Sequence, residues 1–173
     1  MQIVHCSHDR HAAQILEIFN DAIVTSTALF DYQPRTADFM VSWFKTKEAN
    51  RFPAIGFEDA AGKLLGFASY GSFRAWPAYK YSVEHSVYVR KGHRRRGIGR
   101  RLMQELITAA QAQDYHLMVG GIEAANTGSI ALHASLGFTL AGTIRQAGYK
   151  FGRWLDLSFY QLILATPANP SDT

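Results

Sequence analysis

The sequence predicts a single α/β domain in which helices flank a mixed, mostly antiparallel and twisted β-sheet. Three observations predict it: strand-like and helix-like patterns alternate, the length of 173 residues suits one domain, and no repeat or low-complexity linker divides the chain. A composition of 47% hydrophobic and 18% charged residues argues against a disordered or fibrous protein. We expect the domain to span residues 1–166 and residues 167–173 to form a flexible tail.

The first half of the chain predicts a strand, two helices and a hairpin. Ile15, Phe19 and Ile23 recur at helical spacing, and Thr36 is a capping residue in front of a second apolar stripe. Small and turn-forming residues at 59–62 join two apolar runs, which indicates an antiparallel hairpin. The expected elements are a strand at 2–6, a helix at 9–23, a helix that follows Thr36 and includes residues 39–44, and strands at 52–57 and 64–73.

The second half predicts a strand-helix-strand unit, then a further helix and two closing strands. Val83, His85 and Val87 alternate with Glu84 and Ser86, as side chains on the two faces of a strand do. A glycine at 137 is a usual stop for the helix before it. The expected elements are a strand at 81–90, a helix at 98–113, a strand at 117–120, a helix at 127–136, and strands at 138–144 and 154–164.

The segment from Arg90 to Arg101 is the most informative part of the chain. It holds seven Arg and Lys residues and three glycines between an expected strand and an expected helix, so the net charge of +4 is unevenly distributed. Glycines let backbone amides approach an anion, and the N-terminus of the next helix offers unpaired N–H groups and the positive end of its dipole. We therefore expect a pyrophosphate site in this loop.

Three other interpretations of this loop can be compared. A dinucleotide fold needs a third glycine after Gly97 and Gly99, and the chain has none at the required spacing. A P-loop needs a Gly-Lys-Ser or Gly-Lys-Thr triplet, which the sequence lacks. A noncatalytic basic module that binds nucleic acid stays open, because clustered Arg and Lys bind phosphate backbones without any reaction.

The pattern Arg94-x-x-Gly97-x-Gly99 resembles the acetyl-CoA loop of the GNAT superfamily of N-acetyltransferases, and residues 126–138 resemble its second CoA-binding block. The resemblance implies the GNAT fold, acetyl-CoA as cosubstrate, and backbone amides that hold its pyrophosphate. It also gives Asn126 a contact to the cofactor arm and puts His133 where many relatives carry a tyrosine that protonates the departing thiolate. The cofactor-binding residues that it implies are Val87, Tyr88, Val89, Arg94, Arg95, Arg96, Gly97, Ile98, Gly99, Arg100, Asn126 and His133.

The segment 83–89, Val-Glu-His-Ser-Val-Tyr-Val, is similar to the phosphinothricin and methionine sulfoximine acetyltransferase branch of that superfamily, as are segments 71–76 and 148–156. This branch implies a homodimer and a small amino-acid analogue as acceptor, with methionine sulfone and methionine sulfoximine first and phosphinothricin second. Arg74 becomes a candidate clamp for the acceptor carboxylate. The acceptor residues that the branch implies are Phe30, Arg74, Ala75, Trp76, Glu84, His85 and Ser86.

Glu84 and His133 are the expected catalytic residues. An amine that is protonated at neutral pH must lose a proton to attack a thioester, and a carboxylate is a natural base for it. Glu84 lies in an otherwise apolar strand, where burial would raise its pKa and let it accept a proton through water. A histidine at 133 can donate a proton near neutral pH, with packing of a helix face as its other possible role. The expected mechanism is direct transfer in a ternary complex.

No metal and no membrane partner are expected. His5, Cys6, His8 and His11 match no compact zinc motif. A lone cysteine suits a reducing compartment, and the sequence shows neither a signal peptide nor a membrane-spanning run, so we expect a cytoplasmic protein. We also expect no nucleic-acid partner.

Acetylation of a protein N-terminus or of a lysine stays open as a second use of the same chemistry. A peptide acceptor needs an open groove, whereas a clamp at Arg74 with aromatic walls implies a closed pocket. Exposure of Arg74 therefore distinguishes these acceptors.

Overall fold

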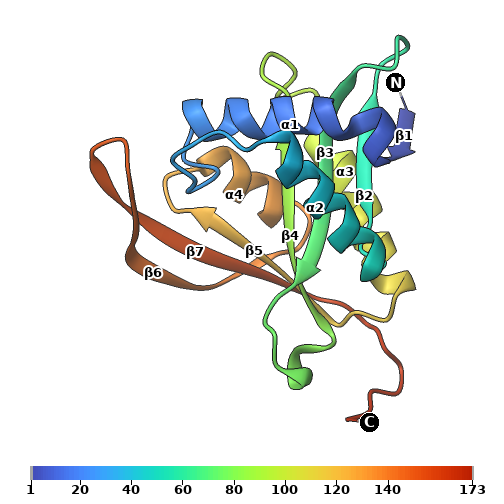
Figure 1. Cartoon of the computed structure of the whole chain (residues 1–173). Coiled ribbons are helices and arrows are strands. Elements are labelled where there is room, and N and C mark those ends of the chain that lie inside the picture. The colour runs from blue at the N-terminus through green and yellow to red at the C-terminus, as the bar shows by residue number, and fades with distance from the viewer. Residues whose placement is uncertain (1, 173) are drawn as a thin grey trace.

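The sheet opens at its centre, and this opening positions the candidate site. The computed structural model describes residues 2–172, and Figure 1 shows the order of elements along the chain. They are β1 (Gln2–His5), α1 (His8–Thr25), α2 (Ala37–Ala49), β2 (Ala54–Glu58), β3 (Leu64–Ser72), the 3-10 helix Pro77–Tyr79, β4 (Ser82–Val89), α3 (Ile98–Ala112), β5 (Leu117–Glu123), α4 (Thr127–Ala134), β6 (Thr139–Lys150) and β7 (Arg153–Ile163).

Within residues 2–172, seven strands form one sheet in the order β1-β2-β3-β4-β5-β7-β6. Every neighbouring pair is antiparallel except β4 and β5, which are parallel. This parallel pairing joins only 82–84 to 117–119, so the two strands part beyond Glu84 and Val119. The structure thus confirms the mixed, mostly antiparallel sheet flanked by helices.

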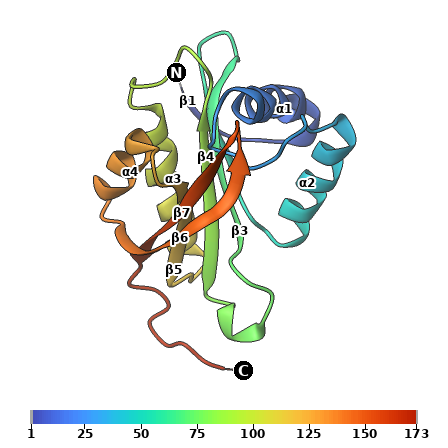
Figure 2. The same ribbon diagram turned by 90° about the vertical axis from the view of Figure 1, so that its left-hand side faces the viewer.

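Helices cover both faces of the sheet. Figure 2 shows α1 and α2 on one face and α3 and α4 on the other. The helices pack there through the apolar stripes of the sequence: Phe19 and Met40 join a core with Phe67, and Leu102 and Leu106 join a second core. Neighbouring residues of β4, whose side chains lie on opposite faces of the sheet, therefore meet different helices: Tyr88 packs with the core of α1, whereas Val87 packs against the core of α3.

The closing hairpin is longer than the sequence indicates. The expected strand at 138–144 extends to Lys150, because the chain continues through an irregular stretch in which Gln146 takes a left-handed φ of 52° and the pairing shifts between Ile144 and Gly148. Polar and small residues there hide the strand from pattern analysis. Residues 164–172 form no regular element, although the Ser171 N–H donates a hydrogen bond to the Tyr81 hydroxyl.

Candidate active site

A large cavity lies where β4 and β5 part. Its volume is about 1160 Å³, and because the sheet is open there, residues from both faces of the sheet line it. The loop before α3 lines one part of the cavity, and the segment after α1 lines another. The expected site residues in its wall are Phe30, Glu84, His85, Ser86, Val87, Tyr88, Val89, Arg94, Arg95, Gly97, Ile98, Gly99, Arg100, Asn126 and His133.

The loop between β4 and α3 has the geometry of an anion site. Gly97 is the N-terminal cap of α3 and takes a left-handed φ of 76°, a conformation that favours glycine. The amides that follow it begin the helix, where backbone N–H groups lack partners within the helix. Arg94, Arg95 and Arg100 add positive charge to the cavity wall, whereas Arg96 lies outside it and contacts the His93 ring at 3.1 Å. These residues fit a pyrophosphate group.

The second expected cofactor block forms the start of α4. The Asn126 side chain caps this helix by accepting a hydrogen bond from the Ser129 N–H at 3.1 Å. Asn126 thus lies in the cavity wall at another helix N-terminus. Across the opening, residues 87–89 of β4 pair with β3 on one side and with no strand on the other, so their backbone groups face the cavity.

Glu84 is the half-buried carboxylate of this cavity. Glu84 is paired with Gly71 of β3. Its Oε1 atom would lie 3.4 Å from a Cβ atom placed on Gly121. Burial raises the pKa of Glu84 above its usual range, and the positive charge of Arg74 opposes part of that rise. A carboxyl group with a raised pKa next to an open space is suited to accept a proton.

His85 and His133 form a buried pair across the opening. Their rings are nearly parallel, with an interplanar angle of 16°, and their Nε2 atoms are 3.2 Å apart. The His133 Nδ1 lies 2.7 Å from the Ser129 carbonyl oxygen, which only accepts, so we assign its proton to Nδ1. His133 Nε2 then accepts the Nε2–H of His85. Burial lowers the pKa of both rings, that of His85 to about 3, which keeps the pair neutral.

Gly120 on β5 makes room for this pair. A Cβ atom at Gly120 would lie 2.8 Å from His85 Nε2 and 3.3 Å from His133 Nε2. The His85 ring lies on the opposite face of β4 from Glu84 and packs against Phe138. His85 therefore borders the cavity from the α4 side, away from the carboxylate.

The hydrogen bonds of His133 make a prediction about the leaving thiolate. The one proton of the neutral ring faces the Ser129 carbonyl oxygen, and Nε2 is an acceptor, so the ring has no N–H to offer the cavity. We expect His133→Phe to lower kcat by less than roughly tenfold and to leave the alkaline side of the pH profile in place. Steady-state rates between pH 6 and 10 measure both. A fall of more than about a hundredfold with loss of the alkaline limb would identify His133 as the acid.

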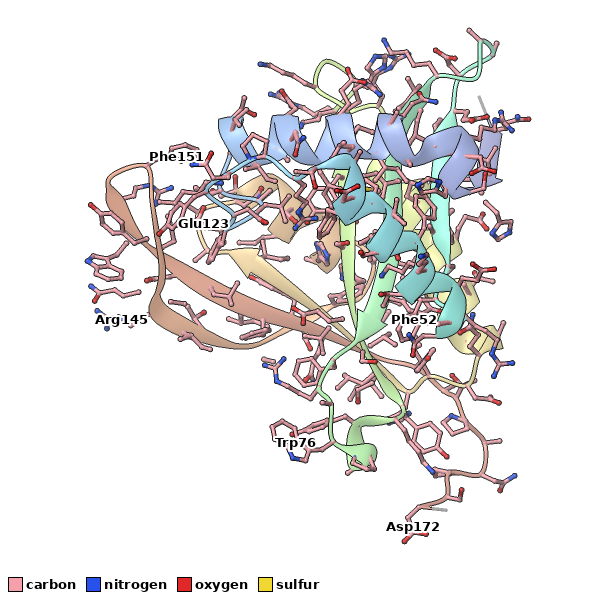
Figure 3. The ribbon with its side chains drawn as sticks, viewed as in Figure 1. Phe52, Trp76, Glu123, Arg145, Phe151 and Asp172 are labelled. Carbon is pink, nitrogen blue, oxygen red and sulfur yellow. The ribbon has the colours of Figure 1, made fainter. Side chains whose placement is uncertain are left out.

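Three expected acceptor residues lie outside the main cavity. Arg74, Ala75 and Trp76 line a separate pocket of about 170 Å³. Arg74 is exposed and donates a hydrogen bond to the Phe73 carbonyl oxygen at 2.8 Å, and Trp76 is 69% exposed. Figure 3 labels Trp76 in the lower part of the view, far from Phe151 and Glu123 near its upper left. The exposure of Arg74 gives no support for a closed pocket built around it.

Sequence reasoning missed four charged residues of the cavity wall: Asp21, Lys47, Glu123 and Arg153. Burial lowers the pKa of Lys47 to about 8, and its Nζ donates to the Tyr70 carbonyl oxygen at 2.7 Å. The Glu123 carboxylate is buried and lies 3.8 Å from an Arg153 guanidinium nitrogen. The signals were a lone lysine on the apolar stripe of α2 and an acidic residue that ends an apolar strand.

Among the described residues 2–172, no group of three or more His, Cys, Asp or Glu side chains is arranged to hold a metal ion. No helix in the same range is long and apolar enough to cross a membrane.

The loop before α3 and a half-buried carboxylate line one cavity where the sheet parts at its centre, an arrangement that suits an enzyme of the acyl-transferring class. The model of the acetyltransferase (GNAT) family matches residues 13–138. The chain belongs to this family, and it is an N-acetyltransferase.

The sequence is 47% identical to the L-methionine sulfoximine/L-methionine sulfone acetyltransferase of Pseudomonas aeruginosa over 150 residues. The match covers 87% of each chain. An N-acetyltransferase structure from Staphylococcus aureus is 46% identical, with a TM-score of 0.91 over 94% of this chain and 97% of that one. A phosphinothricin acetyltransferase from Sinorhizobium meliloti, solved in complex with acetyl-CoA, is 32% identical, with a TM-score of 0.93 over 98% and 91% of the two chains.

Proposed function

We propose that the protein transfers the acetyl group of acetyl-CoA to the α-amino group of a small amino-acid analogue. Methionine sulfone and methionine sulfoximine are the first acceptors in this proposal, and phosphinothricin is the second. Relatives named for these compounds support the order, at 47% and 32% identity. The observation that carries the proposal is the single cavity that joins the phosphate loop at Gly97 to the carboxylate of Glu84.

The proposed reaction is a direct transfer. Glu84 accepts a proton from the acceptor's ammonium group through water, which leaves a neutral amine. The amine nitrogen attacks the thioester carbon, a C–N bond forms, and the C–S bond breaks. A backbone N–H among residues 87–89 polarises the thioester oxygen, because these groups face the cavity and not a strand. As the amide forms, the attacking nitrogen releases its second proton to water, and the departing thiolate takes up one proton from water, since His133 has no N–H directed at the cavity.

We propose that cations in or beside the cavity hold the carboxylate of the acceptor. Arg74 stays a candidate because its charge reaches Glu84, although it lies outside the main cavity. Lys47 and Arg153 are cations within the cavity wall. A carboxylate prefers such partners, and an arginine adds paired hydrogen bonds.

The exposure of Arg74 favours a second candidate acceptor, a peptide N-terminus. A panel of amines separates the two candidates. Purified protein is mixed with acetyl-CoA and methionine sulfone, methionine sulfoximine, phosphinothricin, ordinary amino acids or a short unacetylated peptide, and free CoA thiol is followed. We expect release only with the amino-acid analogues. Release with the peptide alone would replace the proposed acceptor, and no release with any amine would remove it.

The protein's own thiol interferes little with this assay. Burial raises the pKa of Cys6 to about 12, with the nearby Glu58 carboxylate adding to the rise. The thiolate is the reactive form, so Cys6 reacts slowly with a thiol reagent at neutral pH. A protein-only blank measures what remains.

We propose that the protein works as a homodimer in the cytoplasm, with neither nucleic acid nor membrane as a partner. The lone cysteine supports a reducing compartment. Large apolar side chains are exposed along the β6–β7 hairpin, which supports a covered surface there: Leu140, Ile144, Phe151, Trp154 and Ile163. Sedimentation equilibrium gives the mass of the assembly, and a single-chain mass would rule out the dimer.

A further inference from the structure

Lys150 makes three hydrogen bonds from one buried ammonium group. The residue ends β6 and is 5% exposed, and its Nζ donates to the carbonyl oxygens of Ile23 at 2.7 Å, Ser26 at 3.0 Å and Leu29 at 2.6 Å. An ammonium group has three N–H donors, so all of them are used. One side chain of the hairpin thus joins the end of α1 to the segment that follows it.

The partners of Lys150 are groups that need a donor. Ile23 belongs to the last turn of α1, where carbonyl oxygens have no partner within the helix and the dipole favours a positive charge. The last turn of α1 has no basic residue of its own. Lys150 supplies that charge from a strand 127 positions away in the chain.

Neighbouring residues of the hairpin hold the continuation of the same segment. The Phe30 ring lies 2.7 Å from where a Cβ on Gly148 would stand, so the ring packs directly on the backbone of β6. The Tyr32 hydroxyl donates to the Tyr149 carbonyl oxygen at 2.7 Å. Figure 1 shows the loop after α1 beside the turn of the β6–β7 hairpin.

Residues 26–30, here called the acceptor segment, line the cavity, and Lys150 does not. The Thr27 hydroxyl of this segment donates to the buried Glu123 carboxylate at 3.0 Å. Figure 3 labels Glu123 and Phe151 near the end of α1. The phosphate loop comes from other elements, between β4 and α3, so the acceptor segment and the phosphate loop are held by separate contacts.

We propose that Lys150 is a positioning residue that fixes the acceptor segment and thereby sets which amine the cavity accepts. The proposal rests on the proposed function, because it assigns this part of the cavity to the amine. Lys150 acts from outside the cavity through the three carbonyl groups, and it touches no reacting atom. Its loss should therefore weaken acceptor binding and leave acetyl-CoA binding intact.

Lys150→Met tests the proposal, because methionine keeps an unbranched side chain as far as the ε position and removes the ammonium group with all three donors. We expect the KM for methionine sulfone to rise about tenfold, kcat to change less than about threefold, and the KM for acetyl-CoA to stay within about twofold. Amide hydrogen exchange in residues 26–30 should become faster, while exchange in α3 stays as in the unmodified protein. The matched control is Lys63→Met, an exposed lysine in the turn before β3.

Unchanged exchange in residues 26–30, or an equal rise of KM for both substrates, would overturn the role of Lys150. Hydrogen exchange needs no turnover, so it tests the role of Lys150 even if the unmodified protein acetylates no amino acid. Absence of acetylation would contradict the proposed function alone. If Lys150→Met does not fold, Tyr32→Phe replaces it, because Tyr32 is 68% exposed and loses only its bond to the Tyr149 carbonyl oxygen. We then expect a rise of about threefold in acceptor KM with faster exchange near residue 30, and no change in either would contradict the proposal.

Discussion

Glu84→Gln should lower kcat at pH 7 by about a hundredfold or more and leave the affinity for acetyl-CoA unchanged. General-base catalysis contributes roughly 10²- to 10⁴-fold, and the amide cannot take up a proton. Burial raises the pKa of Glu84, so the activity of the unmodified enzyme should rise with pH as this carboxyl group ionises. At higher pH more of the amine is already neutral, and the gap between the two enzymes should narrow. Steady-state rates from pH 5 to 10 measure this.

Glu84→Gln should raise the stability of the fold at pH 7, although it lowers kcat. A carboxyl group whose pKa is raised in the folded state stabilises the fold below its unfolded pKa, and this contribution is lost as pH rises through the folded pKa. Glutamine has no such loss, so the Tm of Glu84→Gln should exceed that of the unmodified protein at pH 7 and match it near pH 4. Glu105→Gln on an exposed site of α3 is the control and should change neither rate nor Tm. Retained turnover in Glu84→Gln would assign the base elsewhere.

Gly97→Ala should weaken acetyl-CoA binding about ten- to thirtyfold. No atom lies within 4 Å of a Cβ at Gly97, so the new methyl group has space, but φ is 76° and a left-handed backbone costs about 1–2 kcal/mol for a residue with a Cβ. Relaxation of this strain would turn the first amides of α3 away from the phosphates. Isothermal titration with CoA measures the affinity directly.

Gly92→Ala is a closely matched control for this effect. Gly92 lies in the same loop, has a left-handed φ of 83° and equally open surroundings, and is not part of the cavity wall. Both variants should lose similar stability, whereas only Gly97→Ala should lose affinity for CoA. Equal losses of affinity would mean that the loop acts as a whole and that Gly97 has no special part in holding the phosphates.

Much of the fold was predictable because its signals are local. The helix that begins at Ile98 and the strand that carries Glu84 follow from apolar spacing, and the tight loop between them follows from its glycines. The extension of β6 to Lys150 was not predicted, since an irregular stretch at Gln146 interrupts the alternation on which strand prediction depends.

The site was predictable where it depends on backbone and less so where it depends on long-range contacts. The ring contact between His85 and His133 joins positions 48 residues apart, and no spacing rule reveals it. The Glu123 carboxylate contacts Thr27 of the loop after α1 and Arg153 of β7, and both residues are far from Glu123 in the sequence. For Arg74 the sequence indicated more than the structure supports: a short motif predicted a residue of the acceptor pocket, and the structure puts Arg74 outside the main cavity.

The parting of β4 and β5 leaves backbone groups in the middle of the sheet with no strand beside them. A folded protein that binds its cosubstrate in such a gap is stabilised by mass action, by about 2.7 kcal/mol when the ligand is at a hundred times its Kd. Resistance to proteases would then follow the supply of acetyl-CoA, since degradation acts on opened molecules. At the same level of mRNA, a cell with a high acetyl-CoA concentration would therefore keep more of this enzyme than a cell with a low one, because the bound cosubstrate stabilises the folded protein.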